Sequence, residues 1–185
     1  MAPFPTFRNL LRRALVIATL IAIPPPLPAE DLAKPRLEVH KAKRELSLFD
    51  GDRLIKTYHV ALGTNPIPPK ERKDDRKTPE GSYYICMKNP KSRFHLSLGI
   101  SYPGPLDAKR GLRDGLISKA EYEAILEAEK KHTAPPWNTG LGGEVFVHGN
   151  GSQSDWTWGC VALEDAEIEE LYAAVPLGTP IVIFP

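Results

Sequence analysis

Nineteen prolines are spread through the 185 residues of this chain, and no other feature constrains its fold as strongly. Proline removes a backbone donor and breaks a helix interior, so long helices are not expected. Short runs rich in β-branched and aromatic residues separate the prolines and are typical of strands. The first runs cover residues 36–40, 45–49 and 54–62, with a hairpin turn at 50–52. We therefore expect an α+β domain that is mainly β.

Two segments carry a helical pattern. Ser118 to Glu121 form a capping box, and Tyr122, Ile125 and Leu126 follow at helical spacing. This predicts a helix inserted between strands, within residues 103–143, as a flap over the functional site. A second amphipathic helix is predicted from Leu163 to Ala174.

Length and charge limit the classes of protein that fit. A chain of 185 residues is long enough for one domain with a genuine core. Its formal net charge of +1 gives no reason to expect nucleic acid binding. The charge-dense run 70–77 mixes both signs and predicts a solvated loop.

The N-terminal 29 residues are predicted to be a secretory signal peptide, which leaves a domain from 30 to 185. Three arginines precede the apolar run 14–23, and Leu27 to Ala29 offer a small residue for cleavage. The run is too short for the roughly 20 residues of a spanning helix. An uncleaved membrane anchor is the alternative. Either case places the domain outside the cytoplasmic membrane, in the periplasm or cell envelope.

His148 and Cys160 are the candidate catalytic residues. His148 ends a strand-like run, and Cys160 ends a small-residue turn twelve positions later. A cysteine beside an imidazole or a helix N-terminus is shifted toward the thiolate, and the pattern predicts both neighbours. Gly159 allows close backbone approach, and the amides of Gly159 and Cys160 are expected to face a developing oxyanion.

The same residue types also fit a protein without catalytic activity. His148 as a satisfied core histidine and Cys160 as a buried thiol would leave a binding module. Cys86 is expected to be a small buried hydrophobe and not the disulfide partner of Cys160. His95 is an open candidate for lining the cleft. The close spacings of a metal site are lacking, so neither metal nor cofactor is expected. The histidines expected to be non-catalytic are His40, His59 and His132.

These residues resemble the L,D-transpeptidase (YkuD-like) catalytic domain, whose signature is His-Gly at a strand end followed by Ser/Thr-x-Gly-Cys. His148–Gly149 matches the first half and Thr157–Cys160 the second. Further similar blocks, including the family's Thr-Pro-Glu-Gly segment, occur at 77–85, 93–103 and 140–143. The resemblance covers residues 36 to 184.

The resemblance implies a mixed β-sheet sandwich or barrel-like fold and acyl transfer on peptidoglycan stem peptides in cell wall biogenesis. Cys160 would form the thioester and His148 would act as base, with the Gly149 carbonyl orienting its ring. The supporting residues in the motif are Gly149, Thr157, Trp158 and Gly159.

Two departures leave the acceptor open. Ala162 stands where family members often carry arginine, and Trp158 where His, Ser, Thr or Ala is common. The Trp-Thr-x-Gly-Cys variant resembles a subgroup that includes enzymes hydrolysing the bond between murein and its anchored lipoprotein. The alternative to a transpeptidase is therefore a murein hydrolase, either an L,D-carboxypeptidase or a lipoprotein-releasing amidase, with an envelope lipoprotein as a further partner.

Overall fold

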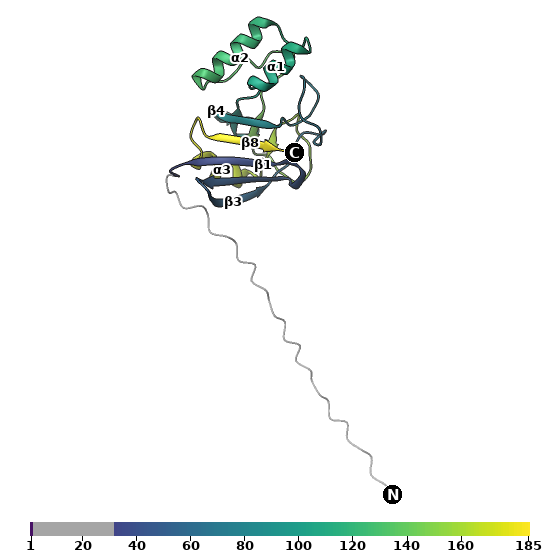
Figure 1. The fold of residues 1–185 in the computed structure, drawn as a ribbon. Helices are drawn as coiled ribbons and strands as arrows, with labels where there is room; N and C mark the ends of the chain where they lie inside the picture. The colour runs from purple at the N-terminus through teal and green to yellow at the C-terminus, as the bar shows by residue number, and fades with distance from the viewer. Residues whose placement is uncertain (2–31) are drawn as a thin grey trace.

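The computed structural model describes Met1 and residues 32–185, where eight strands form one curled mixed sheet accompanied by three α-helices (Figure 1). The strand order is β3-β2-β1-β8-β4-β5-β6-β7. Neighbours are antiparallel except in the parallel pairs β1–β8 and β6–β7. The strands are β1 (Pro35–His40), β2 (Glu45–Asp50), β3 (Arg53–His59), β4 (Gly81–Ser92), β5 (His95–Ile100), β6 (Phe146–His148), β7 (Val161–Ala162) and β8 (Pro180–Phe184). The expected α+β, mainly β fold is confirmed.

The N-terminal strands follow the sequence prediction closely, with one exception. β2 and β3 form the predicted hairpin, and Gly51 at its turn has a φ of 59° that glycine adopts without strain. The predicted strand 54–62 runs too far, because β3 ends at His59. The chain then crosses to the other end of the sheet, where Ala61 bridges Ala162. Residues 60–63 therefore support the candidate site instead of extending the hairpin.

Helix α3 (Asp165–Ala174) packs against β5 and β6 and closes the main core. Ile168 and Leu171 are fully buried, as the apolar stripe predicts. The helix starts two residues later than expected, because both backbone groups of Leu163 are bonded outside the helix, its amide to the His148 carbonyl and its carbonyl to the Gly151 amide. Glu164 takes the N-cap position.

The insertion between β5 and β6 holds two helices, α1 (Pro105–Arg113) and α2 (Lys119–Lys131). They pack together around a small apolar cluster of Ala108, Ile117, Ile125 and Leu141. The predicted capping box is present, with the Glu121 amide donating to Ser118 Oγ at 3.2 Å and the Ser118 amide to Glu121 Oε2 at 2.7 Å. α1 was not predicted, because Gly111 weakens its helical pattern. A Cβ there would lie 2.9 Å from Leu141, so close packing requires the glycine.

The prediction of a solvated loop at 70–77 is wrong at two positions. The Lys70 and Asp75 side chains are only 4% and 5% exposed and form an ion pair of 2.8 Å. Asp75 also accepts backbone hydrogen bonds from Glu71, Arg72 and Lys77. One carboxylate therefore organises this loop between β3 and β4.

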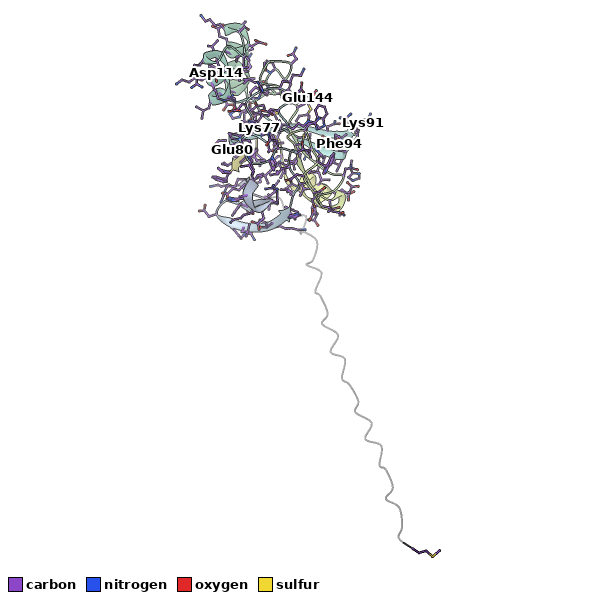
Figure 2. All side chains as sticks on the ribbon, turned by 90° about the vertical axis from the view of Figure 1, so that its right-hand side faces the viewer. Lys77, Glu80, Lys91, Phe94, Asp114 and Glu144 are labelled. Atoms are coloured by element: carbon purple, nitrogen blue, oxygen red, sulfur yellow. The ribbon has the colours of Figure 1, made fainter. Side chains whose placement is uncertain are left out.

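No helix within residues 32–185 has the length and apolar character needed to cross a membrane. The predicted signal peptide, 1–29, lies outside the described residues. Figure 2 shows the side chains over the described domain, with Phe94 and Lys91 near one end of the sheet and Asp114 on the helical insertion.

Candidate active site

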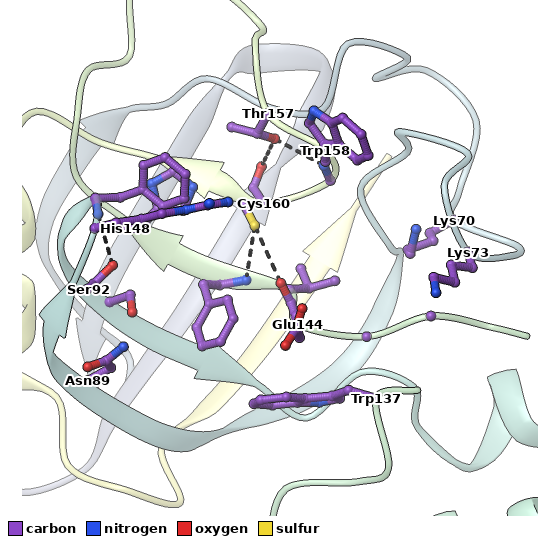
Figure 3. A pocket seen from close by; sticks show the side chains of 18 of the residues that line it. Lys70, Lys73, Asn89, Ser92, Trp137, Glu144, His148, Thr157, Trp158 and Cys160 are labelled. Atoms are coloured by element: carbon purple, nitrogen blue, oxygen red, sulfur yellow. Dashed lines mark hydrogen bonds between the residues drawn. The ribbon is translucent and has the colours of Figure 1, made fainter. Parts of the chain in front are cut away.

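The parallel pair β6–β7 brings His148 and Cys160 together. Val147 is opposite Val161, so the next pair in register sets Phe146 beside Cys160, which directly precedes β7. Side chains alternate along strands, so Phe146, His148 and Cys160 face the same side. His148 and Cys160 line one pocket of about 700 Å³ (Figure 3).

The pocket walls come from four segments far apart in the sequence. These are the β3–β4 loop, the β4–β5 hairpin, residues 137–146, and the turn 156–160. Helices α1 and α2 contribute no lining residue. The insertion instead reaches the pocket through the segment after α2, where Trp137 packs edge-on against Phe146 at 5.5 Å between ring centroids. The predicted helical flap is therefore corrected: the part of the insertion that borders the pocket is the segment after α2, not a helix.

The His148 ring is fixed on several sides. Its Nδ1–H donates to the Gly149 carbonyl oxygen at 2.7 Å, so the neutral ring carries its lone pair on Nε2. Phe94 stacks on the imidazole at 4.6 Å, and Trp156 meets it edge-on at 5.5 Å. Burial lowers the pKa of His148. The arrangement favours a neutral, oriented base at neutral pH.

Gly149 is required by close approach. Its φ is not positive, but a Cβ would lie 2.5 Å from Asp165 Oδ1 and 3.1 Å from the Phe94 carbonyl oxygen. The Gly149 amide donates to that Phe94 oxygen at 3.1 Å. The first residue of α3, the tip of the β4–β5 hairpin and His148 therefore meet at this glycine.

The Cys160 sulfur is placed by backbone groups. Sγ accepts a hydrogen bond from the Phe146 amide at 3.4 Å, and the thiol donates to the Glu144 carbonyl oxygen at 3.7 Å. Desolvation raises the pKa of Cys160 to about 11, against smaller opposing effects of the Phe146 amide and Lys70. Burial therefore opposes the expected resting thiolate. Strand β7 separates Cys160 from the N-terminus of α3, so the helix does not lower the pKa of this thiol.

The turn before Cys160 is built around Thr157. Its hydroxyl donates to the Cys160 carbonyl at 2.8 Å and accepts from the Gly159 amide at 3.1 Å. Gly159 has a φ of 125°, and a Cβ there would lie 2.5 Å from the Lys77 carbonyl oxygen. The expected pair of oxyanion donors is therefore corrected, because the Gly159 amide is already engaged. Of the two amides, that of Cys160 has no protein acceptor within the described chain.

The two positions that depart from the family signature differ in exposure. Trp158 lines the pocket and is 63% exposed. The Arg76 guanidinium lies over the Trp158 ring, with Cζ 4.6 Å from the ring centroid. Ala162 is fully buried, and both of its backbone groups bond to Ala61. Position 162 thus presents no cation to the pocket. The basic residues that line the pocket are Lys70, Lys73, Arg93 and His148.

The other candidates lie elsewhere. His95 does not line the pocket and pairs with Glu169 at 2.6 Å on the surface. The suggestion that His95 lines the cleft is therefore wrong. Cys86 is a half-buried bulge residue of β4 with a free thiol, and burial raises its pKa to about 11. Cys160 is also free. His40 stacks on Phe184, and His132 caps the C-terminus of α2.

A curled, mainly β sheet that sets a histidine and a cysteine into one pocket defines the class of this domain. The chain belongs to the YkuD family, the L,D-transpeptidase catalytic domain, whose family model matches residues 34–183.

The chain is similar to several proteins whose names or titles are known. It is 27% identical over 81 residues to "Putative L,D-transpeptidase YafK" of Escherichia coli K12, covering 40% of this chain and 33% of that protein. The structure of Bd1075 from Bdellovibrio bacteriovorus matches with a TM-score of 0.53 and 25% identity, over 86% of this chain and 54% of that one. The helical cell shape determining protein Pgp2 of Campylobacter jejuni matches with a TM-score of 0.53 and 19% identity, over 81% and 47%. The matched region spans about half or less of the length of each of these proteins.

Proposed function

We propose that this protein is a peptidoglycan L,D-transpeptidase that uses Cys160 as nucleophile and His148 as base. The observation that carries the proposal is the hydrogen bond from His148 Nδ1–H to the Gly149 carbonyl, 2.7 Å long. It leaves the Nε2 lone pair for a proton from the pocket that Cys160 shares. The family's activity on stem peptides supports the choice of substrate.

Acylation begins from a neutral thiol and a neutral imidazole. His148 Nε2 takes the thiol proton as Cys160 Sγ attacks the carbonyl at the L-centre of the diamino acid in a stem tetrapeptide. The Cys160 amide is the donor proposed for the developing oxyanion. Collapse breaks the bond to D-alanine, and the imidazolium returns its proton to the leaving amine. The product is a thioester between the stem and Cys160.

The group that attacks the thioester in deacylation decides whether the enzyme is a transpeptidase or a hydrolase. An amine of a second stem attacks the thioester, gives its proton to His148 and forms the crosslink, while the thiol regains a proton. Attack by water would instead make the protein a murein hydrolase. Exposed Trp158 and the absence of a cation at buried Ala162 favour this second candidate, since the acceptor side differs there from many transpeptidases.

Defined muropeptides decide between the two candidates. Purified protein is incubated with tetrapeptide muropeptides, with and without an added D-amino acid, and the products are identified by mass spectrometry. We expect crosslinked dimers or exchange products. Tripeptides or freed lipoprotein as the sole products would contradict the transpeptidase and support the hydrolase.

The nucleophile is tested independently of the acceptor. A carbapenem lactam mimics the acyl donor, so exposure should add one whole carbapenem to the intact mass through a thioester at Cys160. Cys160→Ala should lose both adduct and turnover, whereas Cys86→Ser should keep both. Turnover by folded Cys160→Ala would overturn the enzyme assignment and favour a peptidoglycan-binding module.

We also propose that the domain acts in the periplasm or cell envelope. The support is the basic segment followed by the short apolar run 14–23. Mature protein from the producing cell should begin near Glu30. Recovery of protein beginning at Met1 from the cytosol would contradict this, and a membrane-bound uncleaved form would support the anchor alternative.

A further inference from the structure

We propose that Arg93 binds the C-terminal carboxylate of the donor stem, on the leaving-group side of the scissile bond. This inference rests on the proposed function and specifies its donor. It makes Arg93 a specificity-determining residue for a leaving amine that carries an adjacent carboxylate.

Arg93 is an exposed residue whose backbone lies in a short turn next to the histidine strand. It occupies the two-residue turn between β4 and β5 with Phe94, since Ser92 pairs with His95. Its guanidinium lies 4.8 Å from the centroid of the Phe94 ring, and that ring stacks on His148. The Phe94 carbonyl accepts from the Gly149 amide, which ties the turn to the histidine strand. Arg93 is therefore held beside the proposed base.

The charge of Arg93 is not neutralised within the protein. Arg93 lines the pocket and forms no ion pair among residues 32–185. The pocket also contains Asp74 and Glu144, but neither pairs with it. Its field disfavours protonation of His148 and favours ionisation of Cys160, as expected for a cation near both. A guanidinium in this state is suited to bidentate binding of a carboxylate.

The chemistry of the donor identifies the carboxylate. His148 must return its proton to the leaving amine, so that amine lies near Nε2. In D-alanine the amine and the carboxylate share one carbon atom, so the carboxylate also lies on the His148 side. Arg93 lies on that side, because it contacts the Phe94 ring that stacks on His148. Lys73 lies across Cys160 from His148 (Figure 3). A leaving amine without an adjacent carboxylate would not gain this contact.

A substrate pair tests the contact directly. Release of D-alanine from a tetrapeptide muropeptide is compared with release of D-alaninamide from the same peptide amidated at its C-terminus. A charged hydrogen bond of this kind predicts a preference of roughly 10- to 100-fold in kcat/KM for the acid. Arg93→Ala should lose this preference by slowing the acid alone. Arg93→Lys should keep part of it, because lysine lacks the planar fork.

Two controls separate this contact from general charge. Lys91→Ala removes an exposed cation of β4 that does not line the pocket, and it should leave both rates unchanged. Lys73→Ala removes one of the two lysines that the β3–β4 loop contributes to the pocket and should keep the preference for the acid. An equal loss for acid and amide in Arg93→Ala, or no preference in the unmodified protein, would overturn the proposal.

Binding measurements keep the test separate from catalysis. Calorimetry compares the acid and amide peptides on Cys160→Ala and on Cys160→Ala combined with Arg93→Ala. We expect tighter binding of the acid only where Arg93 is present. If the intact protein turns over neither peptide, the proposed function fails while this comparison still decides the role of Arg93. Equal binding of the two peptides, or no detectable binding of either, would refute the carboxylate contact.

Discussion

The Thr157 hydroxyl donates to the carbonyl oxygen of Cys160 at 2.8 Å and accepts the Gly159 amide at 3.1 Å. It thereby shapes the turn that presents the candidate nucleophile. Thr157→Val keeps the shape of the side chain but removes both bonds and leaves a buried amide unpaired. We expect a loss of about 1–3 kcal/mol in the free energy of unfolding. The Thr157→Val variant should also form the carbapenem adduct more slowly, as measured by intact-mass spectrometry.

Thr179 provides the matched control for this change. It is also buried, and its hydroxyl donates to the Pro176 carbonyl at 2.8 Å, in a turn outside the pocket. Thr179→Val should destabilise the protein but leave the rate of adduct formation unchanged. Thr157→Ser should retain the rate. Equal slowing by the two valine variants would show that the Thr157 effect is one of stability alone.

Gly159→Ala should abolish adduct formation. The glycine has a φ of 125°, and a Cβ would lie 2.5 Å from the Lys77 carbonyl oxygen, so the turn must move. Gly151→Ala is the comparison, because its φ is 101° but its Cβ would approach nothing nearer than Glu164 Oε1 at 3.9 Å. Both carry a backbone strain of about 1–3 kcal/mol, and Gly159→Ala adds the clash. Equal adduct rates in the two variants would exclude a special role for Gly159.

The sequence predicted the elements with strong local signals. The hairpin at Gly51 and the capping box at Ser118 follow from turn and cap chemistry, which acts within a few residues. The histidine and cysteine were proposed as a catalytic pair from their spacing together with the family motif, which also implied the role of the Gly149 carbonyl. The packing of α1 depends on the contact of Gly111 with Leu141, which local sequence does not encode.

The surroundings of the site were largely missed, because they depend on segments far apart in the chain. Phe94 and Trp156 enclose the imidazole, yet nothing in their local sequence signals a stacking partner. The raised pKa of Cys160 was not predicted, for a similar reason. Its desolvation depends on how the β6–β7 pair and Glu144 enclose the sulfur, and the short strand β7 between Cys160 and helix α3 was not predicted.

Asp155 anchors the turn to the sheet and should be needed for activity. It accepts from Arg44 Nη2 at 2.7 Å and from the Leu62 amide at 2.9 Å. Asp155→Ala leaves a buried amide and a guanidinium without their acceptor, so we expect about 1–3 kcal/mol of destabilisation, measured by urea unfolding. Adduct formation should slow as well, because Thr157 hydrogen-bonds to the same segment, 62–64.

The Lys56–Glu170 pair controls for the loss of a salt bridge. Its side chains are 25% exposed each, against 28% and 23% for Arg44 and Asp155. Glu170→Ala should cost about 1 kcal/mol or less and leave adduct formation intact. If Asp155→Ala behaves in the same way, the anchoring role is wrong.

The stability of the protein should fall as the pH falls below the ordinary pKa of histidine, about 6.5. Burial lowers the pKa of His148 in the folded protein, so the unfolded chain binds the proton first as the pH drops. Urea unfolding of the parent and of His148→Gln between pH 7.5 and 5.5, roughly one unit either side of that value, measures this contribution. The variant should show a smaller loss. An identical pH dependence in both proteins would contradict a depressed pKa.

Alkylation of Cys160 should show no thiolate plateau near neutral pH. The raised pKa of about 11 and the lowered pKa of His148 predict a resting thiol beside a neutral imidazole. In a Cys86→Ser background, the iodoacetamide rate should therefore keep rising through alkaline pH. By contrast, kcat/KM on muropeptides should lose activity only on the acid side, below about pH 6.5, as His148 becomes protonated. A plateau of the alkylation rate already reached below about pH 8 would identify a thiolate and imidazolium ion pair instead, with proton transfer completed before the substrate binds.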